Sequence, residues 1–396
     1  MSLYPWQRIP RYHPQLGPWN ILRASGRQPR GAHILAGGGC TAKEGENLFP
    51  LSNGTAALVV ALRAMRLPAG SGVAVPIYNC VTVFEAVRLA GLRCVFIDND
   101  PDTFGYDLDS LARRSKEVSA AILVHTFGYA GDCDAVSRLL PGRPIIEDCA
   151  HALGSRRGGV PLGFRGVAAA FSFNFHKPVS TGGGGWLIVN NPALLPAVRQ
   201  QVEAMGSPPP RPPAGVLRRR MIKAALYRRP WYGLLLGCGI LQPDREGVLR
   251  DVYVGRMSVL EHVLIEEGLV GLEDRGRRCR DWARRLTDAA GPLAPACHFV
   301  AAGQDWNGYL WPVVLSSAAR REEAMNFLRG RGVDAFLLWL ECLQTAAQYG
   351  YRPGDCPRLE DALPRMMMVP CYAELTDGQQ EYILQAVKEA RLGAGG

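Results

Sequence analysis

Hydrophobic positions follow two alternating patterns along most of this chain. Residues 55–66, TAALVVALRAMR, place apolar side chains at the spacing of one helix face. Short apolar runs follow, separated by helical stretches, at residues 73–75, 94–97, 121–124, 144–146, 168–171 and 186–189. Strands that are apolar throughout and separated by helices predict an α/β fold. Its sheet is expected to be mostly parallel and covered on both faces.

The pattern changes at both ends of this region. The first 45 residues are rich in Pro, Gly and Arg, which predicts irregular structure with one short helix. Residues 207–215, SPPPRPPAG, cannot continue a helix. A helical pattern runs from about Arg256 to Asp281, and a last helix follows Leu375. Thr376 and Gln379 fit a capping box there. We therefore predict an irregular segment at 1–45, a large domain at 46–250 with an insertion at 207–250, and a small C-terminal α/β domain at 251–396.

Composition narrows the class of protein. The chain is 47% hydrophobic and 20% charged, as expected for a globular protein with a sizeable core. Its net charge of +9 comes from scattered residues, which favours anionic small ligands over nucleic acid. Eleven cysteines without a Cys-x-x-Cys pair indicate a reducing compartment and no structural metal site. The N-terminus lacks the apolar run of a signal peptide, and no stretch of about 18 apolar residues exists, so we expect a cytoplasmic protein.

Two motifs in the first half of the predicted sheet could bind a charged ligand. Residues 52–58, SNGTAAL, form a small hydroxyl-bearing turn that enters a helix, which suits phosphate binding or an ordinary helix cap. Residues 145–151, IIEDCAH, place an acidic pair at the carboxyl end of a buried strand. Asp148 there needs a cationic partner, such as a protonated pyridine nitrogen, or a local arginine or amide. His151 is either a second ring contact or a core histidine.

Two further motifs follow in the next part of the chain. Residues 171–177, FSFNFHK, end an apolar strand on Lys177, whose amine would be neutral enough for a Schiff base if it is buried. The plainer interpretation of Lys177 is a surface lysine just past the end of a strand. Ser172 could donate a hydrogen bond from its hydroxyl to a phosphate. Residues 181–185, TGGGG, allow close backbone approach or form a flexible loop. One α/β unit thus contains, in order, a turn suited to phosphate, an aspartate at a strand end, a strand with Ser172 that leads to Lys177, and a glycine turn. Together these motifs predict a pyridoxal 5'-phosphate (PLP) enzyme.

This order of motifs resembles the DegT/DnrJ/EryC1/StrS aminotransferases. The resemblance is strong over about residues 50–200 and looser over 250–390, and it includes residues 96–104, His125, Gly128, residues 256–258 and residues 369–376. It implies the PLP-dependent transferase fold type I: a large domain with a mostly parallel sheet of the seven-stranded type, and a smaller C-terminal α/β domain. It also implies an active site between two subunits, so we expect a homodimer.

The resemblance implies roles for individual residues. Lys177 would carry PLP and move the proton, while Asp148 would pair with the pyridinium nitrogen. Gly54, Thr55 and Ser172 would hold the phosphate, and His151 stands where the family usually has Gln. One branch of the family replaces the lysine with histidine and dehydrates instead. Because Lys177 occupies the lysine position, transamination is favoured.

Two positions depart from the family pattern. The aromatic residue that usually stacks on the cofactor ring aligns with Cys80, and Tyr78 is the nearest substitute. An Asn that commonly reaches the neighbouring subunit's cofactor aligns with Val254. The first 45 residues also match the family poorly.

A basic and apolar segment at 216–241, VLRRRMIKAALYRRPWYGLLLGCGIL, has three interpretations. It could pack on its own dimer, grip an anionic substrate, or lie on an anionic membrane surface. The predicted activity is transfer of an amino group from an amino acid, glutamate first among the candidates, to a keto-sugar nucleotide. Such a reaction belongs to polysaccharide, glycolipid or natural-product biosynthesis. The alternatives are a non-sugar or lipid-like keto acceptor, or a PLP-binding regulatory protein without turnover.

Overall fold

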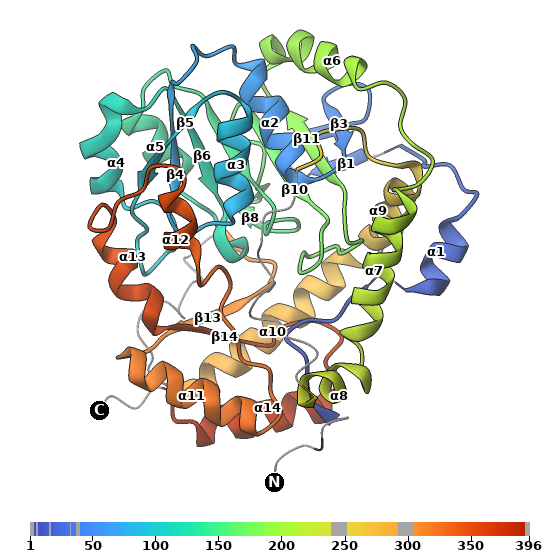
Figure 1. Cartoon of the computed structure of the whole chain (residues 1–396), viewed down its shortest axis with the longest axis vertical. Coiled ribbons are helices and arrows are strands. Elements are labelled where there is room, and N and C mark those ends of the chain that lie inside the picture. The colour runs from blue at the N-terminus through green and yellow to red at the C-terminus, as the bar shows by residue number, and fades with distance from the viewer. Residues whose placement is uncertain are drawn as a thin grey trace.

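A seven-stranded sheet forms the centre of the computed structural model, which describes residues 4, 7–15, 17–31, 33–36, 40–238, 252–291 and 304–392 (Figure 1). Strand β11 runs antiparallel to both of its neighbours, and the other six strands are parallel to one another. The mostly parallel sheet predicted from the sequence is therefore confirmed. In spatial order the strands are β3 (Leu48–Leu51), β11 (Gly185–Val189), β10 (Ala168–Ser172), β7 (Ile145–Asp148), β6 (Ala120–Val124), β4 (Gly72–Pro76) and β5 (Arg93–Ile97).

Helices cover both faces of this sheet. Because side chains alternate along a strand, Val73 and Val75 of β4 share a buried cluster with helices α2 (Gly54–Ala64) and α3 (Val81–Leu89). Ala74 points the other way, into a cluster with α4 (Leu108–Arg114) and α5 (Cys133–Leu139). Two-sided burial explains why these strands are apolar at every position.

The C-terminal part of the chain forms a smaller α/β unit, in the lower half of Figure 1. Its two-stranded antiparallel sheet pairs β13 (Trp311–Val314) with β14 (Met366–Val369). The predicted capping box is confirmed, because Thr376 and Gln379 bond reciprocally at the start of α14. The boundary predicted between residues 250 and 251 lies outside the described residues. The helices of this part are α9 (Val259–Leu269), α10 (Leu272–Ala290), α11 (Ala318–Gly330), α12 (Cys342–Ala347), α13 (Pro357–Ala362) and α14 (Asp377–Glu389).

Two expectations about local structure need correction. The single helix predicted from Arg256 to Asp281 is two helices, α9 and α10, and the second continues to Ala290. The break falls at Gly271, whose φ of 73° lies in the left-handed region that interrupts a right-handed helix. The N-terminal segment contains the predicted short helix, α1 (Pro18–Ala24), but also a hairpin of β1 (His33–Ala36) and β2 (Cys40–Lys43). Four-residue strands carry too few positions for a recognisable pattern.

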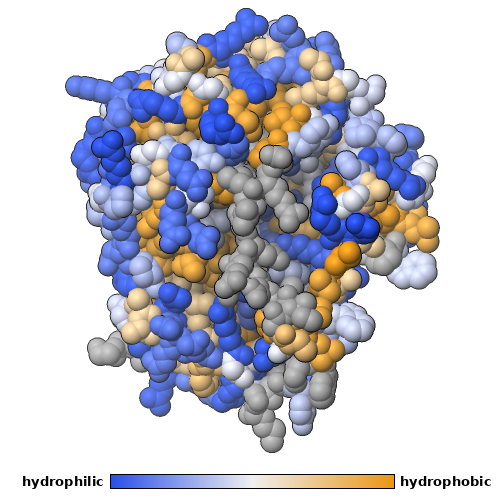
Figure 2. Space-filling model, in the orientation of Figure 1, coloured by the Kyte–Doolittle hydropathy of each residue, from blue (hydrophilic) through white to orange (hydrophobic). Residues whose placement is uncertain are grey.

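The basic segment forms two helices, α7 (Ala214–Leu226) and α8 (Trp231–Gly237), and residues 239–241 lie outside the described part. Several of its cations turn inward. Arg220 pairs with Glu261 at 2.5 Å, and the Lys223 amine lies 5.2 Å from the centre of the Phe175 ring. In Figure 2, hydrophilic and apolar side chains lie side by side on the face formed by α1 and α7. Within the described residues, no helix combines the length and the apolar composition needed to cross a membrane.

Candidate active site

The predicted site residues gather at one edge of the sheet. Strands β3, β4, β6, β7 and β10 are mutually parallel, so their carboxyl ends lie on the same side. Open α/β sheets bind their ligands at this edge. The residues that follow or close these strands are Ser52 to Thr55 after β3, Cys80 after β4, His125 after β6, Asp148 at the end of β7 and Ser172 at the end of β10.

The turn before α2 packs directly on the end of β10. Asn53 caps the helix by accepting a hydrogen bond from the Ala56 N–H at 2.8 Å. A methyl group on Gly54 would lie 2.9 Å from the Ser172 Cβ, and one on Gly185 would lie 2.3 Å from the Asn53 carbonyl carbon. The structure thus brings the three predicted phosphate residues, Gly54, Thr55 and Ser172, to one place. The glycine run serves close approach, because no side chain fits between Gly185 and the turn.

The two neighbouring acids on β7 have different environments. Glu147 accepts hydrogen bonds from His125 Nε2 at 2.9 Å and from the backbone N–H groups of Gly163, Arg165 and Gly166. These four donors satisfy its charge, so Glu147 is a structural carboxylate. Cys149 lies within 4.8 Å of the His125–Glu147 pair, but the glutamate oxygens are already occupied by donors, and we assign no metal to this trio.

Asp148 points to the opposite face of β7. Its Oδ1 accepts one hydrogen bond, from the Ala150 N–H at 3.0 Å. Burial raises the pKa of its carboxyl group, and that N–H together with Lys177 opposes the increase. A buried carboxylate with so few donors is stabilised by a cation placed against it.

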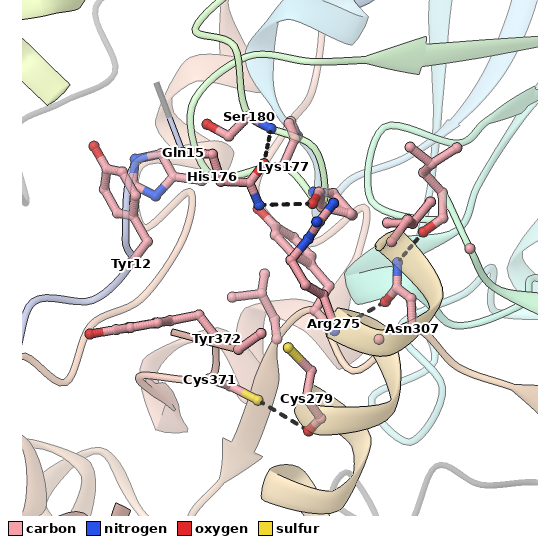
Figure 3. A pocket seen from close by; sticks show the side chains of 18 of the residues that line it. Tyr12, Gln15, His176, Lys177, Ser180, Arg275, Cys279, Asn307, Cys371 and Tyr372 are labelled. Atoms are coloured by element: carbon pink, nitrogen blue, oxygen red, sulfur yellow. Dashed lines mark hydrogen bonds between the residues drawn. The ribbon is translucent and has the colours of Figure 1, made fainter. Parts of the chain in front are cut away.

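Lys177 lies on a loop that leaves the end of β10. The residue before it, His176, has a φ of 61°, and this left-handed backbone turns the chain where the lysine begins. Burial lowers the pKa of the Lys177 amine, while the charges of Cys80 and Asp148 act in the opposite direction. The lysine is therefore electrostatically coupled to Asp148. It also lines a cavity of about 370 Å³ that the C-terminal part closes (Figure 3).

His151 is held as a neutral base beside these residues. Its Nδ1 accepts the Phe127 N–H at 3.2 Å, and burial lowers its pKa well below the ordinary value. The proton of the neutral ring is therefore on Nε2, where it can be donated to a ligand. The ring stacks on Trp339 with 5.3 Å between ring centres and 7° between planes.

The two candidates for ring stacking lie in different places. Cys80 is half-buried at the N-cap of α3, and it lies close enough to Lys177 to act on the pKa of that amine, so it borders the site. Tyr78 is completely buried between Phe104, Phe127 and Trp339, and its hydroxyl donates to the Leu338 carbonyl. Stacking of Tyr78 on a cofactor ring is still a prediction. The packing of Tyr78 among these aromatic rings does not favour it.

Several residues of the cavity were not predicted from the sequence. Asn307 donates from Nδ2 to the carbonyls of His151 and Leu153, and so fixes the loop that follows β7. Arg156, Arg275 and Arg280 line the cavity and donate to backbone carbonyls. Within the described residues, none of the three forms an ion pair with a carboxylate. Their sequence neighbourhoods give no signal, because they converge only through the fold.

Comparison with known proteins agrees with this architecture. The sequence model of the DegT/DnrJ/EryC1/StrS aminotransferase family matches residues 46–388, so the chain belongs to this family of PLP-dependent aminotransferases. It is 25% identical to the dTDP-4-dehydro-2,3,6-trideoxy-D-glucose 4-aminotransferase of Saccharopolyspora spinosa, covering 87% of this chain and 84% of that protein. A pleiotropic regulatory protein of Geobacillus stearothermophilus is 24% identical, with 85% and 83% covered.

Solved structures show the same fold. An aminotransferase of this family from Brucella abortus superposes with a TM-score of 0.68 at 24% identity, over 88% of this chain and 86% of that one. DesV of S. venezuelae superposes with a TM-score of 0.71 at 22% identity, over 95% and 94%. The fold is therefore that of PLP fold type I sugar aminotransferases, as predicted.

The residues present fit PLP. A Cβ on Gly54 would clash with Ser172, so the start of α2 lies close to that hydroxyl, and a phosphate placed there would meet both backbone N–H groups and the hydroxyl. The buried Asp148 carboxylate suits a ring cation, and Lys177 offers an amine whose pKa is lowered by burial. His151 offers one N–H donor between these groups. The chemistry of this set matches a phosphorylated, cationic aldehyde.

Proposed function

We propose that this protein transfers an amino group from an amino acid, glutamate in the first instance, to the ketone of a nucleotide-linked sugar. The observation that carries the proposal is Lys177, coupled to Asp148 and lining a cavity. Relatives support the substrate class by name: besides the dTDP-sugar enzyme, the GDP-perosamine synthase of Escherichia coli O157:H7 is 33% identical over 36% of this chain and 40% of that protein. The product would serve polysaccharide, glycolipid or natural-product biosynthesis.

The chain's own residues would divide the work. PLP, when bound, supplies the electron sink that makes loss of a proton from the substrate carbon feasible. Lys177 holds and returns that proton at Nζ, which its lowered pKa favours because more of the amine is neutral. Asp148 would fix the charge of the ring by staying ionised.

An anionic acceptor is favoured over a lipid-like one. The cavity that adjoins Lys177 presents the guanidinium groups of Arg156, Arg275 and Arg280. Guanidinium groups bind phosphate oxygens in a bidentate manner, which suits the diphosphate of a sugar nucleotide. Three carboxylates, of Glu273, Asp305 and Glu374, line the same cavity and could accept hydrogen bonds from sugar hydroxyls. A purely apolar acceptor would leave these polar groups unpaired.

The test is a half-reaction followed by identification of the modified lysine. Holoprotein mixed with glutamate should lose the visible absorbance of the lysine-bound cofactor and produce 2-oxoglutarate. Borohydride reduction followed by peptide mass spectrometry should place a pyridoxyl group on Lys177. Lys177→Ala should abolish both signals, whereas Lys116→Ala, at an exposed lysine, should change neither. Binding of PLP without any amino-donor reaction would instead support a regulatory protein.

A further inference from the structure

Residues 9–15, called the strap below, connect the C-terminal part of the chain with the lysine loop. One end is anchored by main-chain bonds: the Ile9 N–H donates to the Gly332 carbonyl at 2.8 Å, and the Asp334 N–H donates to the Ile9 carbonyl at 3.0 Å. Arg11 adds a two-pronged ion pair to Asp334, at 2.7 and 3.0 Å, with both side chains buried. The anchor is therefore strong and rigid.

The other end of the strap grips the loop that carries Lys177. The Gln15 amide uses both of its polar atoms there: Nε2 donates to the Pro178 carbonyl at 3.3 Å, and Oε1 accepts the Ser180 N–H at 3.0 Å (Figure 3). On the other side of the lysine, the Tyr12 ring lies against the His176 ring. Two contacts from one segment thus bracket Lys177 in sequence.

Helices α7 and α8 support the strap from behind. Arg228 donates from a guanidinium nitrogen to the Pro14 carbonyl at 3.3 Å, and the Tyr227 ring lies 4.4 Å from that of Tyr12, measured between ring centres. The Tyr232 hydroxyl donates to the same Asp334 carboxylate that anchors Arg11. The strap and the basic segment therefore pack on each other beside the lysine loop. Neither has a clear counterpart in the predicted fold.

We propose that Gln15 is a positioning residue for Lys177, acting through the two main-chain groups that it clamps at 178 and 180. The inference rests on the proposed role of Lys177 as the cofactor-bearing residue. The family match begins at residue 46, so the strap lies outside the residues that define the family. The backbone around His176 is in a strained region, and such a conformation persists only where neighbouring contacts enforce it. Tyr12 and Gln15 supply contacts of this kind on both sides of the lysine.

Substitutions at position 15 separate positioning from folding. Gln15→Met keeps the length of the side chain and loses both hydrogen bonds. Displacement of a catalytic group by about 1 Å costs on the order of 10²-fold in rate. A loosened loop shifts the amine by less than this, so we expect kcat for the glutamate half-reaction to fall by about tenfold while KM changes less than about twofold. Amide hydrogen exchange at Ser180 should become faster, because its N–H loses its acceptor.

Two further variants make the result specific. Gln15→Glu still offers an oxygen to the Ser180 N–H but has no donor for the Pro178 carbonyl. We expect it to keep Ser180 protected from exchange and to lose less of kcat than Gln15→Met. Gln7→Ala removes a glutamine that precedes the strap, accepts a hydrogen bond from the Tyr4 N–H and does not line the cavity. It should behave as wild type.

The readouts distinguish this inference from the proposed function. Unchanged exchange at Ser180 together with unchanged kcat in Gln15→Met would overturn the positioning role, and so would an equal loss in Gln7→Ala. If wild-type protein fails to react with glutamate, the proposed function fails. Exchange at Ser180 still decides whether Gln15 holds the lysine loop, because this measurement needs neither substrate nor cofactor.

Discussion

At the scale of single residues, the adjacent carboxylates Glu147 and Asp148 on strand β7 differ in their surroundings and therefore in what they can bind. Glu147 is surrounded by four donors and lies within the protein's own hydrogen-bond network. Asp148 accepts one hydrogen bond, from the Ala150 N–H, and burial raises the pKa of its carboxyl group, whose charge also acts on Lys177. Since neighbouring strand residues face opposite sides of a sheet, the pair cannot share one function. Only Asp148 is available to pair with a ligand cation.

The titration of Lys177 gives a prediction for the cofactor-free protein. Burial lowers its pKa below the ordinary 10.5, so the neutral amine should react with an acylating reagent at a midpoint below pH 10.5. The Asp148 carboxylate raises this pKa, so Asp148→Asn should move the midpoint to still lower pH. Competitive labelling followed by mass spectrometry measures both midpoints. A wild-type midpoint at or above pH 10.5 would contradict the burial argument.

Local patterns were sufficient to place these candidate residues at strand ends, and the family resemblance suggested their roles. Lys177, Asp148 and Ser172 each follow or close an apolar run, and strand ends can be located from such runs. The partners that fix them could not be found in this way. Trp339 meets His151, and Asn307 meets the loop after β7, across more than one hundred residues of chain. No periodicity records such a contact, because it depends on how the C-terminal part closes over the sheet.

At the scale of elements, the glycine run is the point where strand β11 meets the turn before α2. Gly185 begins β11 and lies against the backbone of Asn53 and Gly54, so β11 and the α2 turn can approach closely. Gly184 beside it has a φ of 89°, which an L side chain rarely adopts. The run therefore fixes the distance between the antiparallel strand and the predicted phosphate turn.

A single methyl group should disturb this junction. In Gly185→Ala the new Cβ would lie 2.3 Å from the Asn53 carbonyl carbon, so backbone must move. We expect the free energy of unfolding to fall by about 1–3 kcal/mol and PLP to bind more weakly. Thermal and denaturant unfolding, with PLP titration by absorbance, measure both effects. Gly378→Ala is the matched control, since its Cβ meets nothing within 4 Å, and it should change stability by less than about 1 kcal/mol.

The order and type of the main elements followed from sequence, and their interruptions did not. The six apolar runs all became strands of the seven-stranded sheet. The break between α9 and α10 was missed because apolar spacing continues through Val270, while Gly271 adopts a conformation that spacing does not report. The seventh strand, β3, covers Leu48–Leu51 and is too short to stand out beside the helix that follows.

At the scale of the whole molecule, several large apolar side chains remain exposed on the N-terminal and inserted helices. They are Trp19 and Leu22 of α1, Ile222 of α7, and Trp231 and Leu234 of α8. Trp19 is 73% exposed and Trp231 is 57% exposed. Large apolar side chains left exposed to this degree are candidates for contact with a partner. Two occupants could cover these side chains. The first is the second subunit of the homodimer that the resemblance implies, and the other is an anionic membrane surface.

Light scattering after size-exclusion chromatography tests the first occupant. We expect a mass about twice the 43.2 kDa of one chain, and a shift toward the single-chain mass for Trp231→Glu, because a buried charge disfavours association. Leu108→Glu, at an exposed position on α4, should leave the mass unchanged. If Trp231→Glu stays dimeric but no longer sediments with vesicles of anionic lipid, these exposed side chains face a membrane instead.

The anchor of the strap has a consequence for biosynthesis. Arg11 and Asp334, its ion-pair partner, are separated by 323 positions. During translation Arg11 has no partner until Asp334 has been made. A partial chain that ends before the C-terminal part would therefore leave the strap without its anchor. The bracing of the Lys177 loop is completed only late in synthesis.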